Sequence, residues 1–154
     1  MCEVPSRRIT LKAEEGELAA LEGWTARLAT DFALPPLLAF RVDLCLTETI
    51  DNLLAYGYPH GRRGSFTVGF CCQPEEILIR VEDDGVAFDP TRYQPAPLPR
   101  SLAEAQTGGR GIRLVRHYAD QIRYERRGDV NHLVLLFRVG SARPPPPAPN
   151  GARD

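Results

Sequence analysis

The chain has 154 residues, a length that fits one domain of ordinary size. Hydrophobic residues make up 43% and charged residues 25%, which excludes a wholly disordered or collagen-like chain. The net charge of −1 gives no general electrostatic case for binding nucleic acid or an anionic membrane. No apolar run approaches the roughly 20 residues that span a bilayer, and the first residues lack the apolar core of a secretory signal. We therefore expect a cytoplasmic protein without a membrane partner.

Only the C-terminal end departs from globular composition. Its last residues read PPPPAPNGARD. Proline runs favour extended polyproline II structure, which has no backbone donors to pair. We expect a folded domain over residues 7–139 and a proline-rich, disordered tail over residues 140–154, although such a run can also dock to an aromatic-lined groove.

The first half of the domain predicts one strand and two helices. Apolar and polar residues alternate over 8–13, the period of a half-buried strand. Apolar residues recur at helical spacing over 15–32, and a second helix over 36–56 begins at a proline pair, because proline suits a first turn. The apolar positions of the second helix include Leu37, Phe40, Leu44, Ile50 and Leu54.

The second half predicts four strands and one more helix. Strands are expected over 65–72 and 76–82, followed by an irregular stretch over 87–107 that contains four prolines. A stretch of that length without regular structure is typically functional, often a lid. A third helix is expected over 111–119. The closing hairpin is expected over 121–126 and 132–139. This order, βααββ-lid-αββ, predicts an α/β (α+β) two-layer sandwich with the helices on one face of a mixed, mostly antiparallel sheet.

An acid and an amide lie on one face of the second helix. Glu48 and Asn52 are four residues apart, and Leu44 precedes them by a turn on the same stripe. Asn52 offers a neutral carbonyl oxygen to a hard cation such as Mg²⁺, and Glu48 can act as a base one turn away. The alternative is a helix face exposed to water.

A second polar position ends the strand over 76–82. Asp83 continues the alternation of Ile77, Ile79 and Val81, so its carboxylate is expected on the buried side. A buried carboxylate needs a donor partner, and the exocyclic amine of adenine is such a donor. Gly85 would let the backbone approach the ring closely. The alternative is a simple strand-end turn, because Asp-Gly pairs commonly form turns.

A glycine-rich segment precedes the third helix. Residues 107–115 read TGGRGIRLV. Exposed N–H groups and the positive end of a helix make this geometry receptive to phosphate. A long irregular loop leads into the segment, which distinguishes it from a dinucleotide-binding fingerprint.

Taken in order, these segments resemble the N, G1 and G2 boxes of the GHKL (Bergerat-fold) ATPase superfamily. Within it, the chain is similar to the anti-sigma-factor serine/threonine kinases. The matching stretches read LTETIDNLLAYGYP over 46–59, VEDDGVAFDP over 81–90 and GGRGIRLV over 108–115. The resemblance covers residues 9–137, and its three boxes are more specific for nucleotide binding than for kinase activity.

The resemblance implies a Bergerat-type fold that binds ATP and Mg²⁺. Asn52 would coordinate the metal that bridges the phosphates, and Glu48 would be catalytic, orienting or deprotonating the attacking hydroxyl. Asp83 would pair with the adenine amine, with Gly85 lining the base.

The phosphate end follows the same resemblance. Gly109 and Gly111 would close it beneath the lid. Apart from the resemblance, charge and location point to Arg100 or Arg110 as the residue that neutralises charge on the transferred phosphoryl group. Two residues depart from the family pattern: Ala87 stands where many relatives have Pro or Gly, and Arg110 separates the two glycines. Both departures concern the geometry of the lid rather than adenine binding.

The resemblance implies an ATP-dependent serine/threonine kinase that binds a sigma factor. Its substrate would be a serine or threonine of a small anti-anti-sigma (STAS-type) protein, and homodimerisation would be in keeping with the family. Two other hypotheses remain. One is a nucleotide-gated module that sequesters a regulator without phosphoryl transfer, and the other is a structural α/β domain whose boxes are coincidental.

Overall fold

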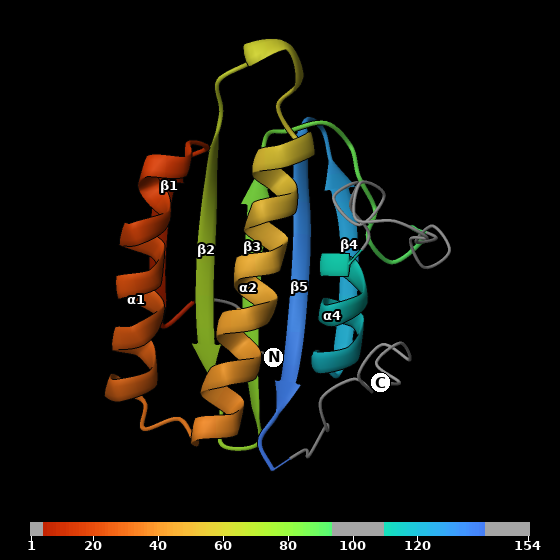
Figure 1. Ribbon diagram of the computed structural model, residues 1–154. Coiled ribbons are helices and arrows are strands. Elements are labelled where there is room, and N and C mark those ends of the chain that lie inside the picture. The colour runs from red at the N-terminus through yellow and green to blue at the C-terminus, as the bar shows by residue number, and fades with distance from the viewer. Residues whose placement is uncertain (1–4, 94–109, 141–154) are drawn as a thin grey trace, which may run out of the picture.

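The computed structural model describes residues 5–93 and 110–140, and shows a sheet covered by helices (Figure 1). Its elements, in chain order, are β1 (Arg7–Lys12), η1 (Glu15–Glu17), α1 (Leu18–Asp31), α2 (Pro36–Tyr56), η2 (Pro59–Gly61), β2 (Ser65–Cys72), β3 (Glu76–Asp83), α4 (Arg110–Tyr118), β4 (Gln121–Arg127) and β5 (Val130–Arg138). Most of the predicted lid and the proline-rich tail lie outside the described residues.

The strands form one five-stranded sheet in the order β1-β2-β3-β5-β4. Each of its four pairings is antiparallel. The helices α1, α2 and α4 lie on the same face of this sheet (Figure 1). The predicted two-layer sandwich is confirmed. Because β5 pairs with the central strand β3, Asp83 at the end of β3 is opposite Asn131 at the start of β5.

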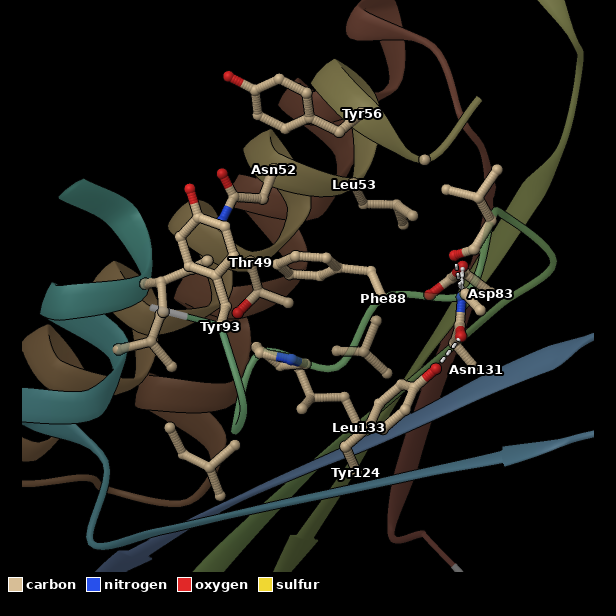
Figure 2. Close-up of a pocket in the computed structure, with 18 residues that line it drawn as sticks. Thr49, Asn52, Leu53, Tyr56, Asp83, Phe88, Tyr93, Tyr124, Asn131 and Leu133 are labelled. Carbon is tan, nitrogen blue, oxygen red and sulfur yellow. Dashed lines mark hydrogen bonds between the residues drawn. The ribbon is translucent and has the colours of Figure 1, made fainter. Parts of the chain in front are cut away.

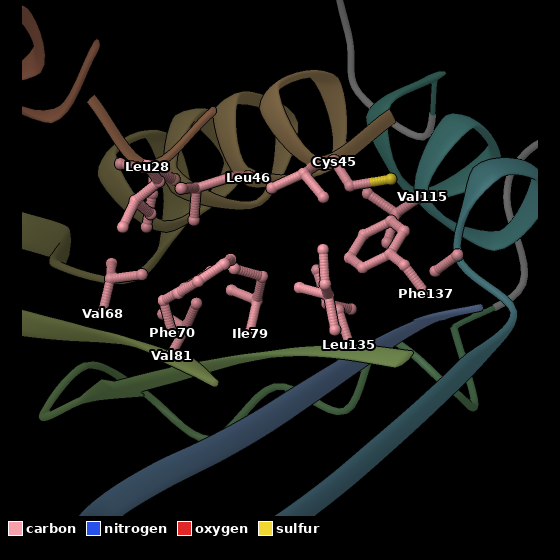
Figure 3. Close-up of a cluster of buried hydrophobic side chains, with 14 of the residues drawn as sticks. Leu28, Cys45, Leu46, Val68, Phe70, Ile79, Val81, Val115, Leu135 and Phe137 are labelled. Carbon is pink, nitrogen blue, oxygen red and sulfur yellow. The ribbon is translucent and has the colours of Figure 1, made fainter. Parts of the chain in front are cut away.

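The core lies between the helical layer and the inner face of the sheet (Figure 3). Alternation along each strand points every second side chain toward the helices. Eight strand residues in this layer are at most 2% exposed: Phe66, Val68, Phe70, Ile77, Ile79, Val81, Leu135 and Phe137. This packing fixes which face of the sheet each side chain lies on. It therefore also fixes the face toward which a polar residue at a strand end points.

The helix α2 has the predicted bounds, but its apolar face differs in part from the expected one. Its buried residues are Leu38, Arg41, Val42, Cys45, Leu46 and Ile50. Leu37 and Phe40 are 48% and 51% exposed, because the helix lies across the sheet and buries only one stripe. In the described part of the chain, no helix combines the length and the apolar character needed to cross a membrane.

A buried cation joins α2 to the C-terminal end of α4. The Arg41 side chain is 1% exposed, and its guanidinium donates to the carbonyl of Tyr118 at 2.7 and 3.0 Å. It also donates to Oδ2 of Asp120 at 2.9 Å, and the backbone N–H of Arg138 donates to the same oxygen. A buried charge requires such a set of partners. The ion pair therefore anchors α4 against α2, the two helices that carry the proposed phosphate-end residues.

Candidate functional site

A cavity of about 360 Å³ opens between α2, α4 and the sheet (Figure 2). Its walls are mostly apolar, with a few polar groups among them, which is the usual character of a small-molecule site. The side chains that line it from α2 include Thr49, Asn52 and Leu53. The sheet contributes Val81, Asp83, Tyr124, Asn131 and Leu133, and the segment after β3 contributes Phe88 and Tyr93.

One end of the cavity is formed by the carboxylate of Asp83. Its Oδ1 accepts hydrogen bonds from the backbone N–H of Gly85 and from Nδ2 of Asn131, both at 2.9 Å. Its Oδ2 accepts none from residues 5–93 and 110–140. One oxygen of a carboxylate that lines the cavity is therefore available to a donor on a ligand.

The neighbouring acid, Asp84, points away from the cavity. Its Oδ1 accepts from the hydroxyl of Tyr58 at 2.8 Å and from the backbone N–H of Ser65 at 3.2 Å. Asp84 thus supports the turn after β3, while Asp83 faces the cavity. Asp83 contributes to the same turn, because its Oδ1 accepts from the N–H of Gly85, and it also lines the cavity. The two hypotheses for this segment, a turn and a ligand-binding group, are therefore compatible.

Gly85 holds the Asp83 carboxylate through its backbone N–H, and its expected place beside the base stays a prediction. A Cβ atom on Gly85 would lie 2.9 Å from Oδ1 of Asp83 and 2.8 Å from the carbonyl oxygen of Gly57. A larger residue would displace the carboxylate or the end of α2. The close approach that this glycine allows is made by the protein itself, and it fixes the position of the Asp83 carboxylate.

The surroundings of Asp83 raise its pKa above the usual value of 3.8. Burial is the largest cause, because it disfavours the ionised form, and the charge of Asp84 adds to it. The hydrogen bonds from Asn131 and Gly85, and the charge of Arg126, act in the opposite direction. The carboxylate is therefore held in an apolar site by a small set of specific donors.

Sequence reasoning missed the hydrogen-bonded residues behind Asp83. Asn131 is 5% exposed, and its Oδ1 accepts from the hydroxyl of Tyr124 and, at 3.0 Å, from the guanidinium of Arg126. Alternation offered a signal, because Asn131 has the same parity along its strand as the inward-facing Leu133 and Leu135. A polar residue in that series needs partners, just as Asp83 does.

The other end of the cavity is formed by α2 and the start of α4. Asn52 lines the cavity, and Glu48 lies one turn away beside Gly111. A Cβ atom on Gly111 would lie 2.6 Å from Oε2 of Glu48 and 3.6 Å from Nδ2 of Asn52. The predicted N and G2 boxes therefore meet, and the glycine makes room for the two polar side chains.

Neither polar side chain at this end has a hydrogen-bond partner among the described residues. Burial raises the pKa of Glu48, and the nearby charge of Asp51 raises it further. A carboxylate with a raised pKa is better suited to accept a proton than an ordinary surface acid. The predicted site residue Gly109, the side chain of Arg110 and all of Arg100 lie outside the described residues.

Asn52 offers one oxygen ligand, which fits a cation whose other ligands come mainly from a bound small molecule and water. In the part of the chain that the structure describes, no group of three or more His, Cys, Asp or Glu side chains could hold a metal ion. Mg²⁺ at phosphate sites usually has one or two protein ligands, with the other positions filled by phosphates and water. One amide oxygen without a protein partner agrees with that arrangement.

Comparison with known proteins places the chain in one family. Residues 11–137 match the family described as the histidine kinase-like ATPase domain. The serine/threonine-protein kinase BtrW of Bordetella bronchiseptica is 33% identical over 118 residues, which cover 77% of this chain and 76% of that protein. The anti-sigma F factor of Clostridium novyi is 28% identical over 86 residues, which cover 54% of this chain and 59% of that protein.

A solved structure shows the same fold. It is the histidine kinase domain of the blue-light-activated histidine kinase from Erythrobacter litoralis, with a TM-score of 0.50 and 20% sequence identity. The match covers 68% of this chain and 46% of that one. Together with the family match, it confirms the fold class and the superfamily predicted from the sequence. The chain belongs to the histidine kinase-like ATPase domain family.

Proposed function

We propose that this protein is an ATP-binding anti-sigma regulator of the cytoplasm that phosphorylates a serine or threonine of its antagonist. The proposal rests on one observation: an apolar cavity has polar groups at both of its ends. Asp83 presents a free carboxylate oxygen at one end, and Asn52, with Glu48 one turn away, presents groups without protein partners at the other. An ATP molecule has its base amine and its phosphates at opposite ends, so it matches this pattern.

At the base end, Asp83 accepts a hydrogen bond from the exocyclic amine of adenine. An ionised carboxylate only accepts, so its Oδ2 pairs with an amine and not with a bare ring carbon. The apolar side chains of Val81 and Leu133 line the cavity and are opposite each other in the β3–β5 pairing, two residues from the pair of Asp83 and Asn131. They would contact the faces of the base. Because this end is buried, the hydrogen bond contributes more to affinity than it would in water.

At the phosphate end, Asn52 offers its carbonyl oxygen to Mg²⁺ on the phosphates. Bound MgATP supplies a γ-phosphoryl group whose charge is partly neutralised by the metal. Glu48 accepts the proton of the attacking hydroxyl or orients that hydroxyl, and its raised pKa supports this role. Gly111 keeps the start of α4 close enough to shield the phosphate end without displacing Glu48.

The relatives support a role in partner switching. One is named a serine/threonine-protein kinase and another an anti-sigma factor. We therefore propose a sigma factor as one partner and a small STAS-type anti-anti-sigma protein as the other and as the phosphoryl acceptor. Phosphorylation of the antagonist would release it, and the protein would then be free to bind the sigma factor.

The test is a phosphoryl-transfer assay with γ-labelled ATP, Mg²⁺ and the antagonist encoded nearest to this gene. We expect label on a serine or threonine of the antagonist, and none when Glu48→Gln replaces the wild-type protein. Formation of a nucleotide-dependent complex without label would instead identify a nucleotide-gated binding module. Absence of any nucleotide binding would remove both functions.

A further inference from the structure

We infer that Asn131 is the positioning residue that gives the cavity its selectivity for a purine with a 6-amino group. This inference rests on the proposed function, in which Asp83 receives the base. Asn131 does not itself contact the base; it acts through the Asp83 carboxylate.

The orientation of the Asn131 amide is fixed by a guanidinium. Arg126 has only donors, so the atom of Asn131 that lies 3.0 Å from its Nη1 must be the carbonyl oxygen. The hydroxyl of Tyr124 donates to the same oxygen. The amide nitrogen must therefore point the other way, toward Asp83.

The amide nitrogen then fixes the carboxylate. It donates to Oδ1 of Asp83 at 2.9 Å and to the carbonyl of Val86 at 2.9 Å, so both of its hydrogens are used (Figure 2). With the N–H of Gly85 also on Oδ1, that oxygen is occupied by protein donors. Oδ2 is left as the one acceptor of Asp83 that has no donor in the described part of the chain.

The position of Asn131 suits it to holding the Asp83 carboxylate in place. It lies directly opposite Asp83 in the β3–β5 pairing, and it is 5% exposed. Its hydrogen bonds join β4, β5 and the segment after β3 behind the carboxylate. A ligand that lacks an amine at this point leaves Oδ2 buried without a donor, which costs binding free energy.

The experiment measures how much the 6-amino group contributes to binding. The probes are ATP and the triphosphate of purine riboside, which lacks a substituent at position 6, and the readout is the ratio of their dissociation constants by calorimetry. For the wild-type protein we expect ATP to bind about 10- to 100-fold more tightly. For Asn131→Leu we expect the ratio to fall by about 10-fold, because the carboxylate is no longer held in place.

A milder variant and its matched control test the inference even if Asn131→Leu does not fold. Tyr124→Phe removes one donor from Asn131, and we expect the ratio to fall by about threefold. Tyr58→Phe is the matched control, since it removes a phenol that donates to Asp84 outside the cavity, and the ratio should stay at its wild-type value. Thermal melts identify the variants that fold.

The pH dependence of the ratio distinguishes a positioning role of Asn131 from a purely structural role. The carboxylate must be ionised to accept the amine, so the ratio falls as the pH is lowered through the pKa of Asp83, which burial raises. The hydrogen bond from Asn131 opposes that rise, as does the charge of Arg126, whereas Asp84 adds to it. Asn131→Leu should therefore lose selectivity at a higher pH than the wild type.

A folded Asn131→Leu protein with the wild-type ratio and pH profile would overturn the inference and leave the proposed function in place. If Asn131→Leu does not fold, a wild-type ratio in Tyr124→Phe overturns it in the same way. A ratio near one in the wild-type protein, or no binding of ATP, would instead remove the recognition of adenine by Asp83, and the inference with it.

Discussion

At the Asp83 end of the cavity the polar groups are held by other protein groups, whereas at the Glu48 end they have no partner among the described residues. Asp83 receives two protein donors, and behind it Asn131 uses both sides of its amide. The side chains of Glu48 and Asn52 make no hydrogen bond to residues 5–93 and 110–140. One end is organised by protein groups alone, and we expect the ligand to complete the other.

This difference has a physical reason. A neutral base offers few hydrogen bonds, so selectivity requires that a single acceptor already be in place. A triphosphate with Mg²⁺ supplies its own charges and ligands, so the protein needs to contribute only a small number of groups.

The largest effect is expected at Glu48. Glu48→Gln keeps the size of the side chain but removes the base, so phosphoryl transfer should fall by about 10²- to 10⁴-fold. ATP affinity should stay close to the wild-type value, because the base end is untouched. Single-turnover transfer and calorimetry on the same preparation measure both. A variant that transfers phosphate at the wild-type rate would exclude Glu48 from the chemistry.

The next effect concerns the metal. Asn52→Ala removes the amide oxygen, and we expect the gain in ATP affinity from Mg²⁺ to drop by about 10- to 100-fold. Binding of AMP without Mg²⁺ serves as the control and should not change. Titrations with Mg²⁺ and with a chelator give the gain directly. If the variant retains the full gain, the metal is held by other groups.

The smallest effect is expected at Gly111. In Gly111→Ala the new Cβ would meet Oε2 of Glu48, the end of a flexible side chain, so the fold should accommodate it while the carboxylate moves. We expect transfer to fall by about 10-fold with little change in melting temperature.

Gly23→Ala in α1 is the matched control for Gly111→Ala. A Cβ at Gly23 meets no atom within 4 Å, so the substitution should stabilise the helix by about 0.5–1 kcal/mol and leave transfer unchanged. Equal transfer rates in Gly111→Ala and the wild type would show that the space beside Glu48 has no role in the reaction.

Most of the fold could be predicted from the sequence because its signals are local. Proline at the start of α2 and alternation in the strands set most element bounds within a residue or two, although α1 begins at Leu18 rather than at residue 15. The order of the strands and the contact between Gly111 and Glu48 come from long-range packing, since spacing alone does not join distant segments.

The residues that sequence reasoning missed act through long-range contacts. Arg41 was not singled out in the sequence, yet its side chain is 1% exposed, paired with Asp120 and hydrogen-bonded to the carbonyl of Tyr118. The role of Asn131 depends on the pairing of β5 with β3, which places it opposite Asp83. Such partners lie about 50 to 80 positions apart in the sequence, so no local pattern predicts them.

The most direct test of the account compares Asp83→Asn with the wild type, using ATP and purine riboside triphosphate. In the variant, Gly85 and Asn131 would still bind the amide oxygen, and the new NH₂ group would face the 6-amino group of adenine. We predict that the wild type prefers ATP and that the variant loses this preference while still binding the analogue. An unchanged preference in a folded Asp83→Asn protein would contradict the claim that Asp83 recognises the base.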